Sequence, residues 1–230
     1  MAGAMLTWLG HASFRIDTPG DKRIYVDPWL EGPTFPQAEK EIERIDVIAL
    51  THGHGDHAGS AVELSKRFKP EVVALVELKG WLGAQGAEVG ELPGPNKGGT
   101  VEAAGCKFTL TNAFHSSSSD EGDYLGEANG IVIELEDGQR LYFAGDTCVF
   151  GDMQLIARIY RPDVAILPIG GHFTMDPKEA AVALELLGNP RCIPCHYGTF
   201  PLLTGTPEEL RRLAPDATIE SLEPGGSISL

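Results

Sequence analysis

The sequence predicts an α/β protein built as a four-layer αββα sandwich, in which two sheets face each other and helices cover their outer sides. Three observations lead to this fold class. Short apolar runs, bounded by glycine, proline and aspartate, recur along the chain and are typical of buried strands. Capped helical patterns alternate with these runs in the second half. The 28 glycines and 42% hydrophobic content suit a loop-rich globular protein.

We treat the 230 residues as a single domain with two pseudo-halves, about 1–128 and 129–230, because the pattern changes near that point. The first half is rich in strands and has one helix, which begins at Asp56 and His57 and ends near Pro70. Its Gly/Pro-rich passage 90–99 is typical of a connector between strands. The clearest strands of this half are residues 23–26, 46–50 and 107–111.

The second half begins with a hairpin, in which the run 130–135 turns at Asp137-Gly138 and returns through residues 141–144. Asp176 and Thr206 are predicted to cap two helices whose first residue is proline. The predicted helices are residues 153–160, 177–187 and 207–213. The remaining predicted strands are residues 164–167, 191–195, 218–222 and 227–230.

The segment 51–57, with the sequence THGHGDH, gathers three of the chain's seven histidines and one carboxylate directly after a strand. Its two glycines let the backbone bend so that imidazoles two and three residues apart converge. Asp56 also suits a helix start, where its charge meets the positive end of the dipole. A polar loop with chance histidines is the alternative, but donor type, spacing and position favour a metal site. Its predicted ligands are His52, His54, Asp56 and His57.

Each of three later predicted strands is followed directly by one further residue that could bind a metal. Active sites of layered α/β folds gather at such strand ends. Taken singly, each of these donors could be an ordinary loop residue. The combined order HxHxDH, His, Asp, His is instead typical of one ligand set. The three additional predicted ligands are His115, Asp146 and His196.

Several segments, taken together with these donors, resemble the metallo-β-lactamase superfamily. They are residues 8–14 (WLGHASF), 24–28 (IYVDP), 51–57, 145–147 (GDT) and 168–175 (PIGGHFTM). The resemblance covers nearly the whole chain and points to the branch of metal-dependent hydrolases that is related to ascorbate-6-phosphate lactonase. It implies the αββα fold and a pair of metal ions. The ligands that it implies are His52, His54 and His115 for the first ion, Asp56, His57 and His196 for the second, and Asp146 as a bridge.

Two divalent ions about 3.5–4 Å apart can share a hydroxide, because metal binding lowers the pKa of water from 15.7 toward about 7. The protein then needs no serine or cysteine nucleophile. Asp56 is therefore also a catalytic candidate, since its free oxygen could orient the attacking hydroxide. All seven donors are nitrogen or oxygen, which fits zinc and, as alternatives, manganese or iron.

Further residues are candidates for roles around this centre. The resemblance places Asp27 behind the metal turn as an acceptor that fixes imidazole tautomers, and a turn aspartate before Pro28 is the alternative. His11 and His172 each lie in a glycine-containing turn and are candidates for substrate contact or a general acid. An ordinary loop histidine is the alternative for both. The polar stretch 116–122, four serines followed by Asp120, Glu121 and Gly122, either lines a pocket or forms a solvated loop.

The composition excludes several classes of partner. A net charge of −15 at pH 7 repels phosphate backbones and anionic membranes, so we expect neither nucleic acid nor a membrane surface as a partner. Two divalent ions would add +4 locally, so a small anionic substrate could still be attracted. No apolar run reaches the roughly 18 residues of a membrane span. The first five residues lack the charged start of an export signal and the four cysteines are expected to be reduced, which indicates the cytoplasm.

These features predict a binuclear metallohydrolase that attacks an ester-like bond of a small molecule, namely a lactone, a carboxylic ester or a phosphodiester. Two alternatives stay open. A di-iron oxidoreductase could use the same ligands, although the chain has no length for the flavin domain that usually accompanies it. A non-catalytic, metal-stabilised binding module would bind metal without hydrolysing anything. Whether the chain forms a homo-oligomer also stays open.

Overall fold

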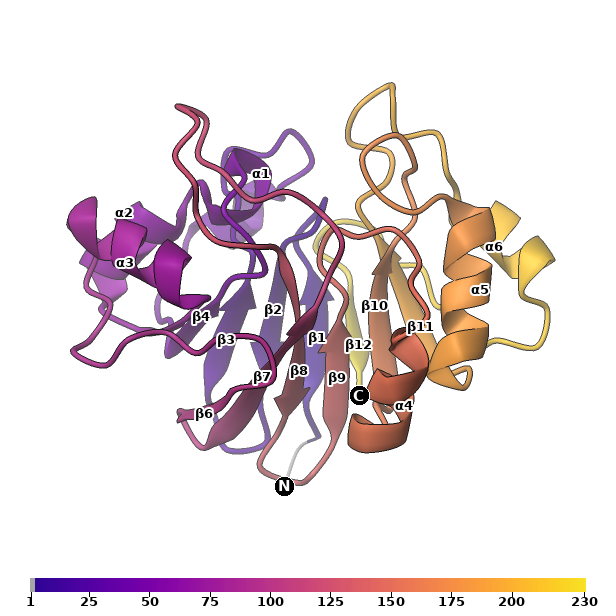
Figure 1. The fold of residues 1–230 in the computed structure, drawn as a ribbon, viewed down its shortest axis with the longest axis horizontal. Helices are drawn as coiled ribbons and strands as arrows, with labels where there is room; N and C mark the ends of the chain where they lie inside the picture. The colour runs from indigo at the N-terminus through magenta and orange to yellow at the C-terminus, as the bar shows by residue number, and fades with distance from the viewer. Residues whose placement is uncertain (1–2) are drawn as a thin grey trace.

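The computed structural model describes residues 3–230 and contains two six-stranded sheets with helices on their outer faces (Figure 1). The α/β class and the four-layer αββα arrangement expected from the sequence are therefore confirmed. Met1 and Ala2, which belong to the start that we examined for an export signal, lie outside the described residues.

The first sheet has the order β12-β1-β2-β3-β4-β5. Strand β2 is antiparallel to both β1 and β3, and β3, β4 and β5 are parallel, so the carboxyl ends of β1, β3 and β4 share one edge. The strands are β1 (Met5–Trp8), β2 (Phe14–Asp17), β3 (Arg23–Val26), β4 (Val47–Ala49), β5 (Glu71–Val73) and β12 (Ser227–Ser229).

The second sheet has the order β11-β10-β9-β8-β7-β6. Strands β6 to β9 are antiparallel, and β9, β10 and β11 are parallel, so the carboxyl ends of β7, β9 and β11 also share an edge. Both edges lie at the top of Figure 1. The strands are β6 (Thr100–Ala103), β7 (Cys106–Asn112), β8 (Asn129–Glu134), β9 (Arg140–Phe143), β10 (Val164–Pro168) and β11 (Arg191–Cys195).

The helices cover the outer face of each sheet. As expected, the Asp176 and Thr206 side chains accept hydrogen bonds from the first-turn amides of Glu179 and Glu209, at 2.9 and 3.2 Å. No helix among residues 3–230 is long and apolar enough to cross a membrane. The helices are α1 (Gly55–Ala58), α2 (Ala61–Phe68) and α3 (Val76–Ala84) beside the first sheet, α4 (Met153–Tyr160), α5 (Pro177–Leu187) and α6 (Pro207–Leu213) beside the second, and the 3-10 turn Gln37–Lys40.

Side-chain alternation along the strands produces the four layers. Ile24 and Val26 of β3 pack into the core between the sheets, whereas Tyr25 between them packs beneath the helices. In β10, Ile166 faces the inter-sheet core and Leu167 faces α4 and α5. Because successive side chains of a strand point to opposite faces, such fully apolar strands require covering layers on both sides.

Two expected elements were wrong. Residues 218–222 do not form a strand, and only Ile219 forms a bridge, with Cys192 of β11. The ladder stops because the next donor position on β11 is Pro194, which has no N–H. The expected single helix after the metal turn is two helices, α1 and α2, separated at Gly59 and Ser60.

The two sheets are not built from two continuous parts of the chain. The sheets do not separate near residue 128, because β6 and β7 already belong to the second sheet and β12 returns to the first. The passage 90–99 connects helix α3 to β6 rather than joining two strands. Helix α3 was missed because Gly80 and Gly83 lie within it and its apolar residues form no distinct stripe.

Candidate metal centre

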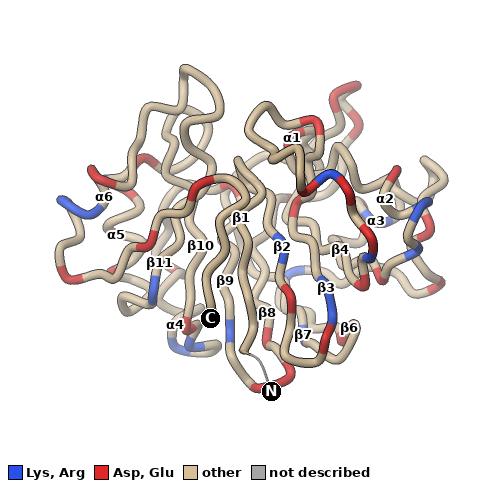
Figure 2. Tube along the Cα trace, turned by 180° about the vertical axis from the view of Figure 1, so that it is seen from behind, with Lys and Arg blue, Asp and Glu red and all other residues tan. Residues whose placement is uncertain are grey.

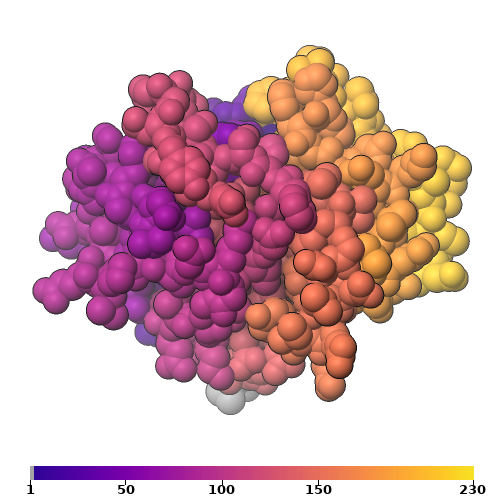
Figure 3. All heavy atoms as spheres, viewed as in Figure 1, coloured from indigo at the N-terminus to yellow at the C-terminus, as the bar shows by residue number. Residues whose placement is uncertain are grey.

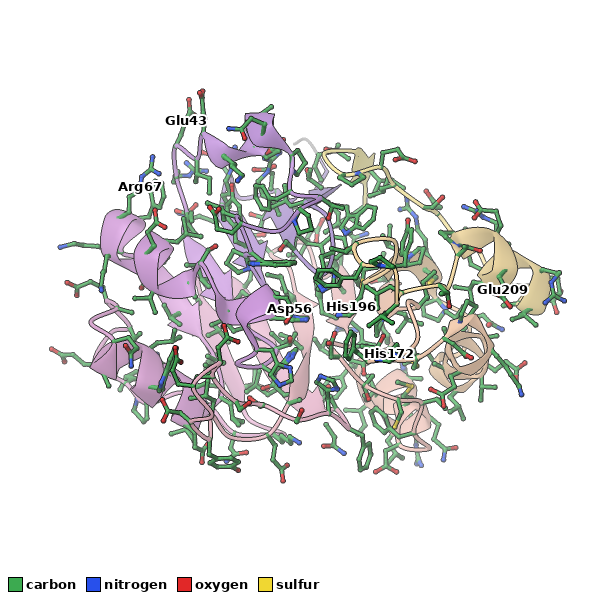
Figure 4. The ribbon with its side chains drawn as sticks, turned by 90° about the horizontal axis from the view of Figure 1, so that it is seen from above. Glu43, Asp56, Arg67, His172, His196 and Glu209 are labelled. Carbon is green, nitrogen blue, oxygen red and sulfur yellow. The ribbon has the colours of Figure 1, made fainter. Side chains whose placement is uncertain are left out.

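Six histidines and two aspartates converge between the two sheets, at the edge where strands of both sheets end. Figure 4 looks down on this edge and shows Asp56 and His196, which come from opposite halves of the chain, close together. Their potential ligand atoms form overlapping groups in which all members lie within 4.8 Å of one another. The groups are His52, His54 and His115; His52, His57 and Asp146; and His11, Asp56, His57 and His196.

Asp146, directly after β9, lies between the histidines expected at the two metal positions. Its Oδ2 is 3.2 Å from Nε2 of His196 and 3.6 Å from Nε2 of His115. The same oxygen is 4.0 Å from Nε2 of His52, and Oδ1 is 3.4 Å from Nε2 of His57. One buried carboxylate thus faces four imidazoles, which is the placement that a bridging ligand requires.

Asp27, after β3, lies behind the metal turn. Its Oδ2 accepts hydrogen bonds from the Thr51 hydroxyl at 2.6 Å and from Nδ1 of His57 at 2.8 Å. The Thr51 hydroxyl, whose proton goes to Asp27, can only accept from Nδ1 of His52, 3.0 Å away. With Nδ1 of each ring protonated, Nε2 of both rings faces Asp146 and is the nitrogen that could bind a cation. This arrangement matches the tautomer-fixing role hypothesised for Asp27.

Burial controls the charges of most of these groups. It lowers the pKa of His52, His54 and His115, so these imidazoles are neutral near pH 7 and their lone pairs are available. Burial alone would raise the pKa of Asp146 and of Asp56. Nearby His196 and His57 more than offset it at Asp146, and the hydrogen bond from His11 does so at Asp56, so both pKa values are lowered. These three imidazoles and both carboxylates are therefore in the forms that bind a cation.

His57 is the exception among the histidines. Burial favours its neutral form, but attraction to Asp146 and Asp27 outweighs burial and raises its pKa well above the usual value. The metal-free protein therefore carries a proton on His57 at pH 7, and this proton has to leave when Nε2 binds a cation.

We accordingly expect metal binding at pH 7 to release a proton from His57 and the affinity to rise with pH. Calorimetric titration with zinc in buffers of different ionisation enthalpy measures the released protons. Asp27→Asn removes one of the two carboxylates that hold this proton, so it should reduce the release. An affinity that is independent of pH between 6 and 8 would contradict the assignment.

The donor set fits divalent cations. Nε2 of His57 is fully buried and has no hydrogen-bond partner, although a buried nitrogen normally has one. Nε2 of His52 and Nδ1 of His54 lie only 3.0 Å apart, a short separation for two neutral imidazole nitrogens unless they share a proton or a cation. Nitrogen and carboxylate donors without a thiolate suit zinc, manganese and iron.

Three strand-end residues at the centre have left-handed backbones, with φ of 50° at His11, 46° at Asp27 and 53° at His196. Such a conformation costs about 1 kcal/mol or more for a residue other than glycine. The surrounding hydrogen bonds maintain it, including one from the His196 amide to the His11 carbonyl at 2.9 Å. Strain of this kind clusters at functional sites, which supports a functional role for this edge.

The two further candidate histidines have different surroundings. His11 is buried, and its Nε2 is 3.0 Å from Oδ2 of Asp56. Burial lowers the pKa of His11 to about 4, so a neutral imidazole occupies this position near pH 7. His172 is exposed and packs edge-on against Phe173, and no hydrogen bond within residues 3–230 connects it to the donor cluster. Its catalytic role stays a prediction.

A cavity of about 500 Å³ opens beside the donors His54 and Asp56. Ser118 and Ser119 contribute to its wall, so the serine run lines a pocket, one of its two expected readings. Figure 3 shows this edge hollowed between the loop around residue 120 and the loops around residues 170 and 200. Asp120, which follows the serines in the same polar stretch, also lines the cavity. Further lining residues were not predicted, and only proximity to the metal turn in sequence or space was a signal for them. They are Trp29, Glu31 and Ser60.

Comparison with known proteins agrees with this fold. Residues 22–197 match the profile of the beta-lactamase superfamily domain. A UPF0173 metal-dependent hydrolase of Herpetosiphon aurantiacus is 51% identical over 234 residues, covering 98% of this chain and 97% of the relative. The chain therefore belongs to the metallo-β-lactamase superfamily, as the sequence resemblance indicated. Within that superfamily it is a metal-dependent hydrolase.

Solved structures extend the comparison. Igni18, a metallo hydrolase from the hyperthermophilic archaeon Ignicoccus hospitalis, is 33% identical and superimposes with a TM-score of 0.88, covering 100% of this chain and 99% of Igni18. CmlA, a diiron beta-hydroxylase from Streptomyces venezuelae, is 14% identical with a TM-score of 0.77, and the match covers 100% of this chain and 55% of CmlA. The second likeness concerns the fold alone.

Proposed function

We propose that this protein is a binuclear hydrolase that cleaves an ester-like bond of a small molecule: a lactone, a carboxylic ester or a phosphodiester. The observation that carries the proposal is the position of Asp146 between the histidines of two donor groups. Two bound divalent ions, zinc or alternatively manganese or iron, would activate a water molecule for attack. No serine or cysteine nucleophile is needed.

The residues around this centre have separate tasks in the proposal. Asp146 holds the two halves of the ligand set together and neutralises part of the cation charge. Asp56 belongs to the donor cluster and also lines the cavity, so its carboxylate can bind a cation and orient the attacking water. Asp27 and Thr51 hold protons on Nδ1 of His57 and His52, so the Nε2 atoms of both rings face inward, where each could bind a cation.

The cavity suits a small substrate, since its volume of about 500 Å³ lies in the usual range for such ligands. Its wall includes Glu31, Asp56 and Asp120, and no lysine or arginine among the described lining residues. Negative charge on a substrate would therefore have to lie at the metal ions rather than along the wall. The negative charge that we expect on the substrate is thus restricted to its reacting end.

The expected partners follow from charge in the same way. Lysine and arginine are scattered along the trace in Figure 2 and form no continuous stripe in the part that it describes. With a net charge of −15, this distribution among the described residues favours neither a phosphate backbone nor an anionic membrane as a partner. We therefore retain a small molecule in the cytoplasm as the proposed substrate.

Metal analysis combined with a substrate panel tests the proposed function. We expect two divalent ions per chain, and metal-dependent hydrolysis of at least one class among lactones, carboxylic esters, phosphodiesters and thioesters. Two irons with a visible absorption band and no hydrolysis would favour the oxidoreductase alternative. Two ions without turnover of any substrate would favour the binding module.

The hydrolysis rate should rise with pH, because attack requires the ionised form of the activated water. We expect kcat/KM to increase about tenfold per pH unit below the pKa of that water and to level off above it. The measurement is a rate profile of the metal-loaded enzyme between pH 5 and 9. A flat profile over this range would count against the mechanism.

A further inference from the structure

His11 reaches the donor cluster in the same manner as the proposed ligands. It follows β1, whose carboxyl end lies at the same edge as those of β3 and β4. Its carbonyl accepts hydrogen bonds from the indole of Trp8 and from the amide of His196, both at 2.9 Å. Its ring is buried against the His196 ring, with centroids 3.9 Å apart, and against Trp29. The imidazole is therefore fixed in position.

The Nε2 atom of His11 points to the group at the second metal position. It lies 3.0 Å from Oδ2 of Asp56, and it is within 4.8 Å of the ligand atoms of His57 and His196. Metal–ligand bonds of about 2.1 Å place neighbouring donors on one ion about 3.0–3.4 Å apart. The spacing between His11 and Asp56 fits such a pair, as does the 3.2 Å between His196 and Asp146.

The other ring nitrogen of His11 has the partner that a metal-binding histidine needs. Nδ1 is 2.9 Å from the hydroxyl of Thr199, which can donate in turn to the carbonyl of Tyr197 at 3.5 Å. The same series of hydrogen bonds occurs at His52, where the Thr51 hydroxyl accepts from Nδ1 and donates to Asp27. With a cation at the second position, the proton of His11 would lie on Nδ1 and be held by Thr199, as Thr51 holds that of His52, and Nε2 would be free to bind the cation.

We propose that His11 is an eighth metal ligand, which binds the second ion through Nε2 beside Asp56, His57 and His196. This proposal rests on the two-metal function proposed above. It makes the two positions unequal, because the second has four protein donors besides Asp146 and the first has three. More donors favour six-coordinate ions such as manganese or iron at the second position, whereas the first suits four-coordinate zinc.

Nitrogen NMR of the ¹⁵N-histidine-labelled protein loaded with two equivalents of zinc tests the proposal without relying on activity. We expect His11 to carry its proton on Nδ1, with Nε2 unprotonated and bound to zinc. A proton retained on Nε2 in the loaded protein would overturn the proposal, since His11 would then only hydrogen-bond to Asp56 and position it. This measurement uses the unaltered protein and does not depend on the folding of a variant.

Zinc titration of variants provides the second readout. Asparagine tolerates the left-handed backbone conformation of residue 11. His11→Asn should weaken the binding of the second zinc ion by more than 100-fold and leave the binding of the first unchanged. Thr199→Val, which removes only the partner of Nδ1, should weaken the binding of the second ion about 10–100-fold. His172→Asn, outside the cluster, should bind both ions as the parent does. Equal affinity for the second zinc in His11→Asn and parent would refute the proposal.

The two proposals fail in different ways. If the parent protein never takes up a second divalent ion, whether zinc, manganese or iron, the binuclear function itself is wrong. If the parent binds two zinc ions and hydrolyses a substrate but His11 keeps its proton on Nε2, the function stands and only the role of His11 is wrong.

Discussion

Asp146→Asn is expected to lower the hydrolysis rate by about 1,000-fold or more and to reduce the metal content from two ions per chain to one or none. Both oxygens of Asp146 face imidazole nitrogens, at 3.2 Å for His196 and 3.4 Å for His57. An amide has one neutral oxygen, and its NH₂ group would point toward a nitrogen that should bind a cation. The bridge between the two positions would be lost.

The same substitution should destabilise the metal-free protein. Without the Asp146 carboxylate, the protonated His57 would keep only Asp27 as a counter-charge in a fully buried position. Removal of one partner from a buried ion pair typically costs about 3–5 kcal/mol of the free energy of unfolding. Denaturant unfolding in the presence of a chelator measures the loss of stability. Metal analysis measures the loss of bound ions. The exposed Asp152→Asn, with the same change of charge, is the control. Full metal content in Asp146→Asn would refute the bridging role.

Gly170→Ala is expected to lower the free energy of unfolding by about 3 kcal/mol and to weaken metal binding together with it. A Cβ at residue 170 would lie 2.1 Å from the carbonyl oxygen of His196 and 3.1 Å from Leu203. That overlap with backbone cannot be relieved by a change of rotamer, so the ends of β10 and β11 must separate. His196 is at that strand end, so its imidazole would move away from Asp146.

Gly151→Ala is the matched control, because a Cβ at residue 151 meets nothing within 4 Å. Thermal unfolding with and without chelator, together with zinc titration, would compare the two variants. We expect Gly151→Ala to unfold within about 1 kcal/mol of the parent and to bind zinc normally. A stable Gly170→Ala protein with unchanged zinc affinity would show that the close approach at His196 is not required.

The donor set was predictable because its chemistry is local. Residues 51–57 carry four donors in one turn, and His115, Asp146 and His196 each follow an apolar strand. Because active sites of layered α/β folds collect at strand ends, these donors are expected to lie together. The structure brings all seven to one edge. Their role as metal ligands stays a prediction that the metal analysis would test.

Other features depended on tertiary contacts that no local pattern records. Thr199 partners His11 across 188 positions of the chain, and Trp29 lines the cavity from a loop that sequence alone did not place there. Residues 218–222 have strand-like composition, but Pro194 on the neighbouring strand ends the pairing. These outcomes are decided by neighbours in space, which propensity and periodicity do not encode.

The pairing of β12 with β1 has a consequence for how the protein is made. Residues 5–7 have their partners at 227–229, and the proposed ligands extend as far as His196. During translation, β12, which closes the first sheet, and His196, which completes the proposed ligand set, therefore leave the ribosome late. We expect nascent chains stalled before residue 196 to capture zinc weakly, and metal loading to follow the synthesis of β11 and β12.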